Sequence, residues 1–200
     1  MKQREHPRFA EFAAWCAKHA SKAKPLTGEF YRVAGPRHTT AKAIVSGIGA
    51  FAGGGRWNSP GVMRIVYTSV EPETALREAN EHFRYGNMPI SKGLPKVIVA
   101  FAVTLERVLD FTDATLASVM PESMSSLLAE DWRALMARGE MSSSQAMGRA
   151  AFEAGLQGLI VPSKPDPTGV NLLIFPERLT RKCRLKVLNA AELDKLGKAV

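Results

Sequence analysis

Six polar side chains stand at or near the ends of apolar segments, where folding could bring them into a cleft. They are Arg32, Arg56, Tyr67, Glu78, Ser163 and Asn171. An arginine guanidinium is planar and donates paired hydrogen bonds, which suits it to phosphate-like anions. A carboxylate in the same cleft could stabilise a cation that develops during a reaction. These residue types predict an anion-binding cleft with the groups of an enzyme.

The position of Glu78 on its helix favours a place in that cleft. Pro72 suits the first position of a helix, and the pattern predicts that this helix continues through residues 74–84. On a helical wheel Glu78 lies at the margin of the apolar stripe. The stripe contains Ala75, Leu76, Ala79 and Phe83, whereas Glu73, Arg77 and Glu81 lie on the solvent side. A carboxylate at this margin can face a cleft.

Several other kinds of site are excluded or unsupported. The chain has no P-loop, and Gly47-Ile48-Gly49 precedes more glycine where a dinucleotide-binding motif would open a helix. The four histidines and two cysteines lack metal-ligand spacing, so we expect no metal site. No G-x-S-x-G elbow marks a nucleophilic serine.

The net charge of +8 first suggests a polyanionic partner. That charge lies at the two ends, because residues 1–24 carry +4 and residues 178–200 carry +5. The middle, residues 25–177, carries −1. A nucleic-acid-binding module would therefore have to use the termini, and the chemistry of the middle does not depend on bulk charge.

Helices and strands are interspersed without a regular βαβ rhythm, which predicts an α+β fold with a mixed or antiparallel sheet. The strand candidates are residues 30–33, 64–69, 97–103, 158–162, 170–175 and 184–188. The helix candidates are residues 9–20, 39–47, 74–84, 113–138 with a break near Pro121, 145–154 and 190–198. Residues 22–28 are expected to form a linker, because they contain Pro25 and Gly28.

Three separated blocks of the sequence resemble the RES domain family. The first block is Tyr31-Arg32 followed by Gly54-Gly55-Arg56-Trp57-Asn58 and Pro60-Gly61. The second is Val66-Tyr67-Thr68-Ser69 followed by Thr74-Ala75-Leu76-Arg77-Glu78. The third is Gly158-Leu159-Ile160-Val161-Pro162-Ser163 followed by Asn171-Leu172-Leu173-Ile174-Phe175. The blocks occur in the order that the family has, which makes the resemblance specific.

The resemblance implies a fold and a domain division. The expected fold is like that of ADP-ribosyltransferases, with a mixed or antiparallel split sheet and flanking helices around an NAD cleft. Residues 29–177 would form the RES domain. Residues 1–28 would form an N-terminal amphipathic helix and linker, and residues 178–200 a basic strand and helix in the same globule.

The resemblance also implies an activity and partners. Family members act as toxins of bacterial toxin–antitoxin pairs, with an Xre-like antitoxin as partner and NAD as substrate. They degrade NAD by hydrolysis or phosphorolysis, or transfer ADP-ribose to a protein, and each reaction breaks the nicotinamide–ribose bond. No signal peptide or membrane span is visible, so we expect a cytoplasmic protein. Because the histidines and cysteines lack metal-ligand spacing, we expect no metal cofactor beside the NAD that the resemblance implies.

Site roles follow from the same resemblance. The family's arginine, glutamate and serine correspond to Arg32 or Arg56, to Glu78 and to Ser163, and we take Arg32, Glu78 and Ser163 as the catalytic set. NAD-binding residues would be Arg32, Arg56, Trp57, Tyr67, Ser163 and Asn171. Glu78 would stabilise the ribosyl cation, and the arginines would bind the pyrophosphate. Tyr67 would stack on the nicotinamide ring.

Overall fold

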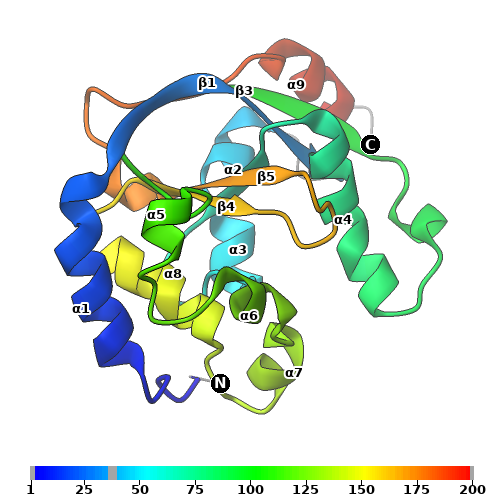
Figure 1. Ribbon diagram of the computed structural model, residues 1–200. Coiled ribbons are helices and arrows are strands. Elements are labelled where there is room, and N and C mark those ends of the chain that lie inside the picture. The colour runs from blue at the N-terminus through cyan, green and yellow to red at the C-terminus, as the bar shows by residue number, and fades with distance from the viewer. Residues whose placement is uncertain (1–2, 36–39, 199–200) are drawn as a thin grey trace.

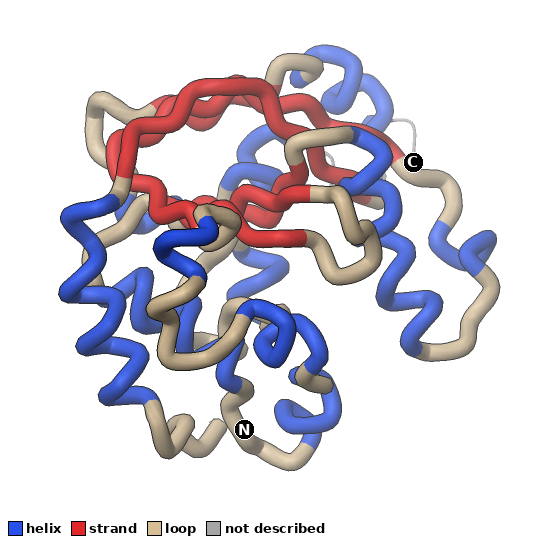
Figure 2. The backbone as a smooth tube through the Cα atoms, viewed as in Figure 1, coloured by secondary structure: helices blue, strands red, loops and turns tan. Residues whose placement is uncertain are grey.

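The computed structural model describes residues 3–35 and 40–198, and its centre is one mixed sheet of six strands. The strands are β1 (Lys24–Ala34), β2 (Val66–Ser69), β3 (Val97–Asp110), β4 (Gly158–Pro162), β5 (Val170–Ile174) and β6 (Arg184–Val187). Their order is β1-β2-β5-β4-β3-β6, and β1 also pairs with β3. Five strands thus close into a ring that β6 extends (Figures 1 and 2). The α+β fold with a mixed sheet is confirmed.

Strand β1 is much longer than the sequence predicts. It pairs with β3 from Lys24 to Ala34, so the linker expected at residues 22–28 is wrong from residue 24 onward. The register shifts between Lys24 and Leu26, and Pro25 lies at this irregularity. Proline is tolerated at bulges because no ladder hydrogen bond is required of its nitrogen there. The long pairing with β3 therefore outweighs the local turn signals.

Helices cover the sheet at several places (Figure 1). Five of the described helices are α1 (Phe9–His19), α2 (Ala41–Val45), α3 (Ile48–Gly53), α4 (Pro72–Tyr85) and α8 (Ser143–Glu153). Four further helices are α5 (Ala114–Ala117), α6 (Met124–Ala129), α7 (Trp132–Ala137) and α9 (Ala190–Lys198). Short 3₁₀ segments cover Ala20–Lys22, Ile90–Gly93 and Pro176–Arg178. No described helix is long and apolar enough to cross a membrane.

The described helices differ from the predicted ones at three places. The helix expected over residues 113–138 is three short helices, because Asp113, Ser123 and Asp131 each cap a new start with a side-chain oxygen. The glycine-rich stretch from Gly47 to Gly61, where no helix was predicted, contains helix α3, which ends at Gly53 and is followed by Gly54 with φ 71°. The helix expected over 39–47 is α2, and the expected first residue, Thr39, lies outside the described residues.

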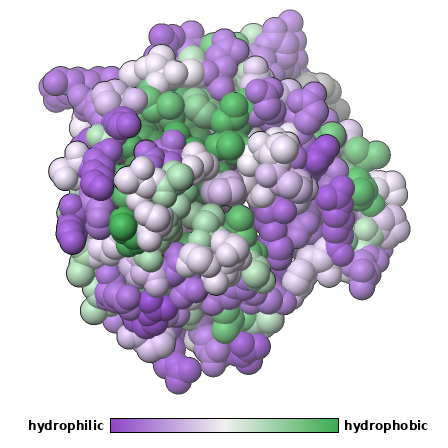
Figure 3. Space-filling view, viewed as in Figure 1, coloured by the Kyte–Doolittle hydropathy of each residue, from purple (hydrophilic) through white to green (hydrophobic). Residues whose placement is uncertain are grey.

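Two groups of buried apolar side chains hold these layers together. One lies between α1, α8 and the sheet and includes Phe12, Trp57 and Phe111. The other lies among the strands and includes Phe101 and Leu172. In the space-filling view, hydrophobic side chains gather in the upper centre of the visible face and hydrophilic ones dominate its rim (Figure 3).

Replacing Gly148 with alanine is expected to destabilise the protein. Gly148 lies in α8, and a Cβ built there would stand 2.0 Å from the carbonyl oxygen of Trp57. The backbone must shift to relieve that overlap, so we expect the free energy of unfolding to fall by about 2 kcal/mol. For a chain of this length the melting temperature would fall by roughly 4–8 °C, measurable by calorimetry.

The control is Gly53→Ala, since a Cβ at Gly53 meets no atom within 4 Å. That change should leave the melting temperature unchanged or raise it slightly, because alanine favours helix over glycine. Equal melting temperatures for the two variants would show that α8 and the Trp57 loop are not packed so closely.

Candidate active site

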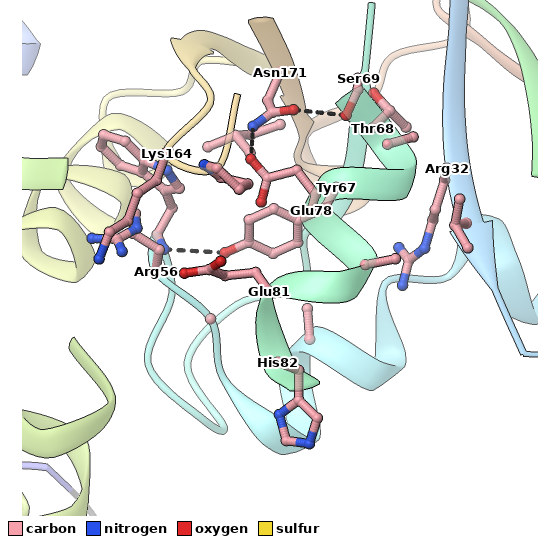
Figure 4. A pocket seen from close by; sticks show the side chains of 18 of the residues that line it. Arg32, Arg56, Tyr67, Thr68, Ser69, Glu78, Glu81, His82, Lys164 and Asn171 are labelled. Carbon is pink, nitrogen blue, oxygen red and sulfur yellow. Dashed lines mark hydrogen bonds between the residues drawn. The ribbon is translucent and has the colours of Figure 1, made fainter. Parts of the chain in front are cut away.

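Two side chains from the β4–β5 hairpin hold the carboxylate of Glu78. The Ser163 hydroxyl and the Asn171 amide each donate to Oε1 at 2.6 Å. Figure 4 shows Asn171 bridging Glu78 and Ser69, whose hydroxyl donates to Asn171 Oδ1 at 2.7 Å. The other oxygen, Oε2, has no hydrogen bond to the described part of the chain, so it is open to a ligand.

Sheet register brings these partners together. In the antiparallel pairing of β2 with β5, Ser69 lies opposite Asn171, and in that of β4 with β5, Val161 lies opposite Asn171. Ser163 follows the end of β4 and is buried. Helix α4 then carries Glu78 across this hairpin, because Thr74 and Ala75 in its first turns are buried. The predicted helix is confirmed, and Glu78 lies in the wall of the cavity described below.

The Tyr67 hydroxyl is built into the glycine-rich loop. It donates to Asn58 Oδ1 at 2.8 Å and accepts from the Trp57 backbone N–H at 3.1 Å. A Cβ at Gly55 would stand 2.5 Å from this hydroxyl, so Gly55 makes the approach possible. Burial raises the pKa of Tyr67, which keeps the hydroxyl protonated. The ring of Tyr67 remains part of the cavity wall.

Arg56 is bound to the protein itself. Its Nη1 donates to the carbonyls of Leu127 at 3.0 Å and Glu130 at 3.1 Å, at the C-terminal end of α6. A cation there complements the free carbonyls of the last helical turn. Burial lowers the pKa of Arg56, and the charges of Glu78 and Glu81 oppose that shift. Arg56 therefore fastens α6 beside the cavity while its guanidinium still lines it.

Arg32, unlike Arg56, has no hydrogen-bond partner among the residues that the structure describes. On β1 it shares a face with buried Phe30 and lies opposite buried Val99, so its side chain leaves the sheet on the core side. It makes no hydrogen bond or ion pair with residues 3–35 or 40–198, and burial lowers its pKa. In Figure 4 it stands apart from Arg56 and Lys164, with Glu78 and Tyr67 between them. An uncompensated, largely desolvated cation is suited to bind an anionic ligand.

These side chains line one cavity of about 440 Å³, within the range of small-molecule sites. Of the predicted NAD-binding residues, the lining includes Arg32, Arg56, Trp57, Tyr67 and Asn171. Ser163 lies behind this wall and reaches the site through Glu78. Trp57 is 3% exposed and packs against Phe111 at 6.2 Å between ring centroids.

The cavity also contains charged and aromatic residues that sequence reasoning missed. They are Glu81, His82, Trp132, Arg133 and Lys164. Glu81, which we expected on the solvent side of α4, lines this cavity together with the α6–α7 segment, which contributes Leu128, Trp132 and Arg133. Leu76 is exposed, so the prediction that it belongs to the buried apolar stripe of α4 is wrong. Nothing in the sequence pattern indicates this, since the segment is held by contacts such as those of Arg56 and by the bond from Tyr85 to Asp131.

The charges of this cavity suit a dianionic ligand that also carries a cation. Arg32, Arg56, Arg133 and Lys164 are basic, while Glu78 and Glu81 are acidic. In the described part of the chain, no group of three or more His, Cys, Asp or Glu side chains is arranged to hold a metal ion.

Comparison with known proteins gives a family match over most of the chain. Residues 29–191 match the model of the RES domain. The chain is 30% identical over 159 residues to the Prs ADP-ribosylating toxin of Sphingobium sp. (strain YBL2), covering 76% of this chain and 84% of that protein. It is 27% identical over 161 residues to the NAD(+) phosphorylase MbcT of Mycobacterium tuberculosis (strain ATCC 25618 / H37Rv), covering 78% and 80%.

A solved structure has the same fold. It is the crystal structure of the M. tuberculosis MbcT–MbcA toxin–antitoxin complex, which matches with a TM-score of 0.66 and 23% sequence identity. The match covers 92% of this chain and 97% of the matched chain. It therefore includes residues outside the region that matches the family model.

Proposed function

The chain belongs to the RES domain family, and we propose that it binds NAD around Glu78 and cleaves the bond between nicotinamide and ribose. The observation that carries this proposal is the fixed carboxylate, which Ser163 and Asn171 hold at one oxygen beside a cationic cavity. Two relatives are named for reactions that consume NAD, which supports it further.

The proposed chemistry follows from these groups. Arg32 binds the NAD pyrophosphate, and the free Glu78 oxygen faces the ribose. As the glycosidic bond breaks, nicotinamide leaves with the bonding electron pair and becomes neutral, while positive charge develops on the ribose. The Glu78 carboxylate stabilises that charge, as carboxylates do in glycoside cleavage. Water or phosphate oxygen then bonds to the ribose carbon, giving ADP-ribose with release of a proton, or ADP-ribose phosphate.

In the cell, this activity would make the protein a toxin of a type II toxin–antitoxin pair. Depletion of NAD would arrest growth, and a cognate Xre-like antitoxin would cover the cavity and exclude NAD. The toxin–antitoxin complex found among similar structures supports a protein partner. We propose a cytoplasmic location, where NAD and such a partner are available.

A protein-directed ADP-ribosyltransferase is the second candidate, favoured by the relative that is 30% identical. It shares the site and transfers ADP-ribose to a protein side chain. Incubation with labelled NAD in whole lysate distinguishes degradation of NAD from transfer of ADP-ribose to a protein. One labelled protein band supports transfer, whereas labelled free products support degradation.

The direct test is to incubate the purified protein with NAD, with and without phosphate, and to identify the products by mass spectrometry. Nicotinamide release is expected in both conditions if water is the acceptor, and only with phosphate if phosphate is. Absence of nicotinamide in all conditions, including with lysate, would contradict the proposed function.

A further inference from the structure

The serine that holds Glu78 stands at the start of the β4–β5 loop, and an aspartate fixes that loop to α4. We propose that Asp166 is a positioning residue, which sets Ser163 against Glu78 by fastening this loop to the helix. The inference rests on the proposed function, since it concerns the geometry of the same carboxylate.

Asp166 is 6% exposed and uses both of its carboxylate oxygens. Oδ2 accepts from the buried Thr74 hydroxyl at 2.7 Å, and Oδ1 accepts from Arg77 Nη1 at 2.9 Å. Both donors belong to the first two turns of α4. Asp166 thus connects the β4–β5 loop to α4 by side-chain hydrogen bonds.

The loop itself transmits this contact to Ser163. The Gly169 N–H donates to the Asp166 carbonyl at 2.9 Å, and the Ser163 N–H donates to the Gly169 carbonyl at 2.9 Å. Pro165 and Pro167 flank Asp166 and restrict the backbone on both sides. A change at Asp166 therefore reaches the Ser163 backbone through two hydrogen bonds.

Helix geometry places the contact with Asp166 and the carboxylate of Glu78 on the same face of α4. Thr74 and Glu78 are four residues apart, so they lie one above the other on α4. A Cβ at Gly169 would stand 2.6 Å from Thr74 Cγ2, which shows how closely the loop backbone lies against this face. The loop therefore meets α4 one turn before Glu78.

The other donor to Glu78 does not depend on the loop. Asn171 lies in β5, where pairing with Ser69 of β2 and Val161 of β4 fixes its position. Loss of the Asp166 contact should therefore displace Ser163 and leave Asn171 in place. This difference gives the inference a specific signature.

The test measures NAD cleavage by Asp166→Ala, Ser163→Ala and Asn171→Ala, alone and combined. Asp166→Ala is expected to lower kcat about tenfold or more, with KM for NAD nearly unchanged, because a small displacement of a positioned group slows the reaction. The double variant Asp166→Ala/Ser163→Ala should have nearly the same kcat as Ser163→Ala alone. In contrast, the kcat losses caused by Asp166→Ala and by Asn171→Ala should multiply in their double variant.

Asp166→Asn should recover most of the activity, because it keeps an oxygen for the buried Thr74 hydroxyl. The lost ion pair involves half-exposed Arg77 and contributes little. The matched control is Asp113→Ala, which removes the cap of α5 outside the cavity and should leave kcat unchanged. Unchanged kcat in Asp166→Ala, or an effect that multiplies with Ser163→Ala, would overturn the inference.

Hydrogen exchange separates this inference from the proposed function. Amide exchange at Ser163 and Gly169 should accelerate in Asp166→Ala and stay unchanged in Asp113→Ala, whether or not the protein cleaves NAD. A wild-type protein that leaves NAD intact would contradict the proposed function alone. Unchanged exchange at Ser163 in Asp166→Ala would contradict the fastening role.

Discussion

Replacing Glu78 with glutamine is expected to lower kcat for NAD cleavage at least 100-fold, a loss of about 3 kcal/mol of transition-state stabilisation. Glutamine keeps the size of the side chain and an oxygen that can accept from Ser163 and Asn171. It removes the negative charge that would face the ribosyl cation. Since NAD itself lacks that developing charge at the ribose carbon, KM should change much less than kcat.

The control for this change is Glu73→Gln on the same helix. Glu73 is exposed and lies outside the cavity lining, so its replacement should leave kcat and KM unchanged. Both variants should be assayed for nicotinamide release and for growth arrest when expressed. A Glu78→Gln protein as active and as toxic as wild type would remove Glu78 from the chemistry.

The sequence predicts the parts of this site that depend on local pattern. Pro72 and the apolar stripe of α4 identify the helix and the margin position of Glu78. Apolar runs with polar ends identify the strands that carry Ser163 and Asn171. The resemblance of three sequence blocks then joins these segments into one site, which periodicity alone could not do.

The remaining parts depend on contacts between distant segments. Pro25 and Gly28 are local turn signals, yet pairing with β3 makes the segment a strand. From the sequence, Arg56 is predicted to bind an anion. In the structure its Nη1 donates to two backbone carbonyls, one in α6 and one in the residue that caps α6. Side-chain patterns carry no information on which carbonyls a folded chain will present, so the α6–α7 wall of the cavity could not be predicted.

Replacing Arg32 with methionine is expected to weaken NAD binding about 100-fold, because the pyrophosphate would lose a bidentate, charge-assisted contact. Titration calorimetry with NAD in the Glu78→Gln background measures this affinity without turnover. Arg32→Lys keeps the charge and loses the forked pair of donors, so its affinity for NAD should lie between those of the wild type and Arg32→Met. The control is Arg84→Met, since Arg84 is exposed on α4 and lies outside the cavity lining.

The stability of these variants distinguishes a binding arginine from a structural one. Burial lowers the pKa of Arg32, and no described carboxylate pairs with it, so the folded protein bears the cost of desolvating its charge. Arg32→Met should therefore keep or raise the melting temperature while NAD binding is lost. Arg56→Met should lower the melting temperature, because it leaves the carbonyls of Leu127 and Glu130 without their donor. A fall in melting temperature for Arg32→Met with NAD affinity intact would assign Arg32 to the fold, and Arg56 would then be the arginine left to bind the pyrophosphate.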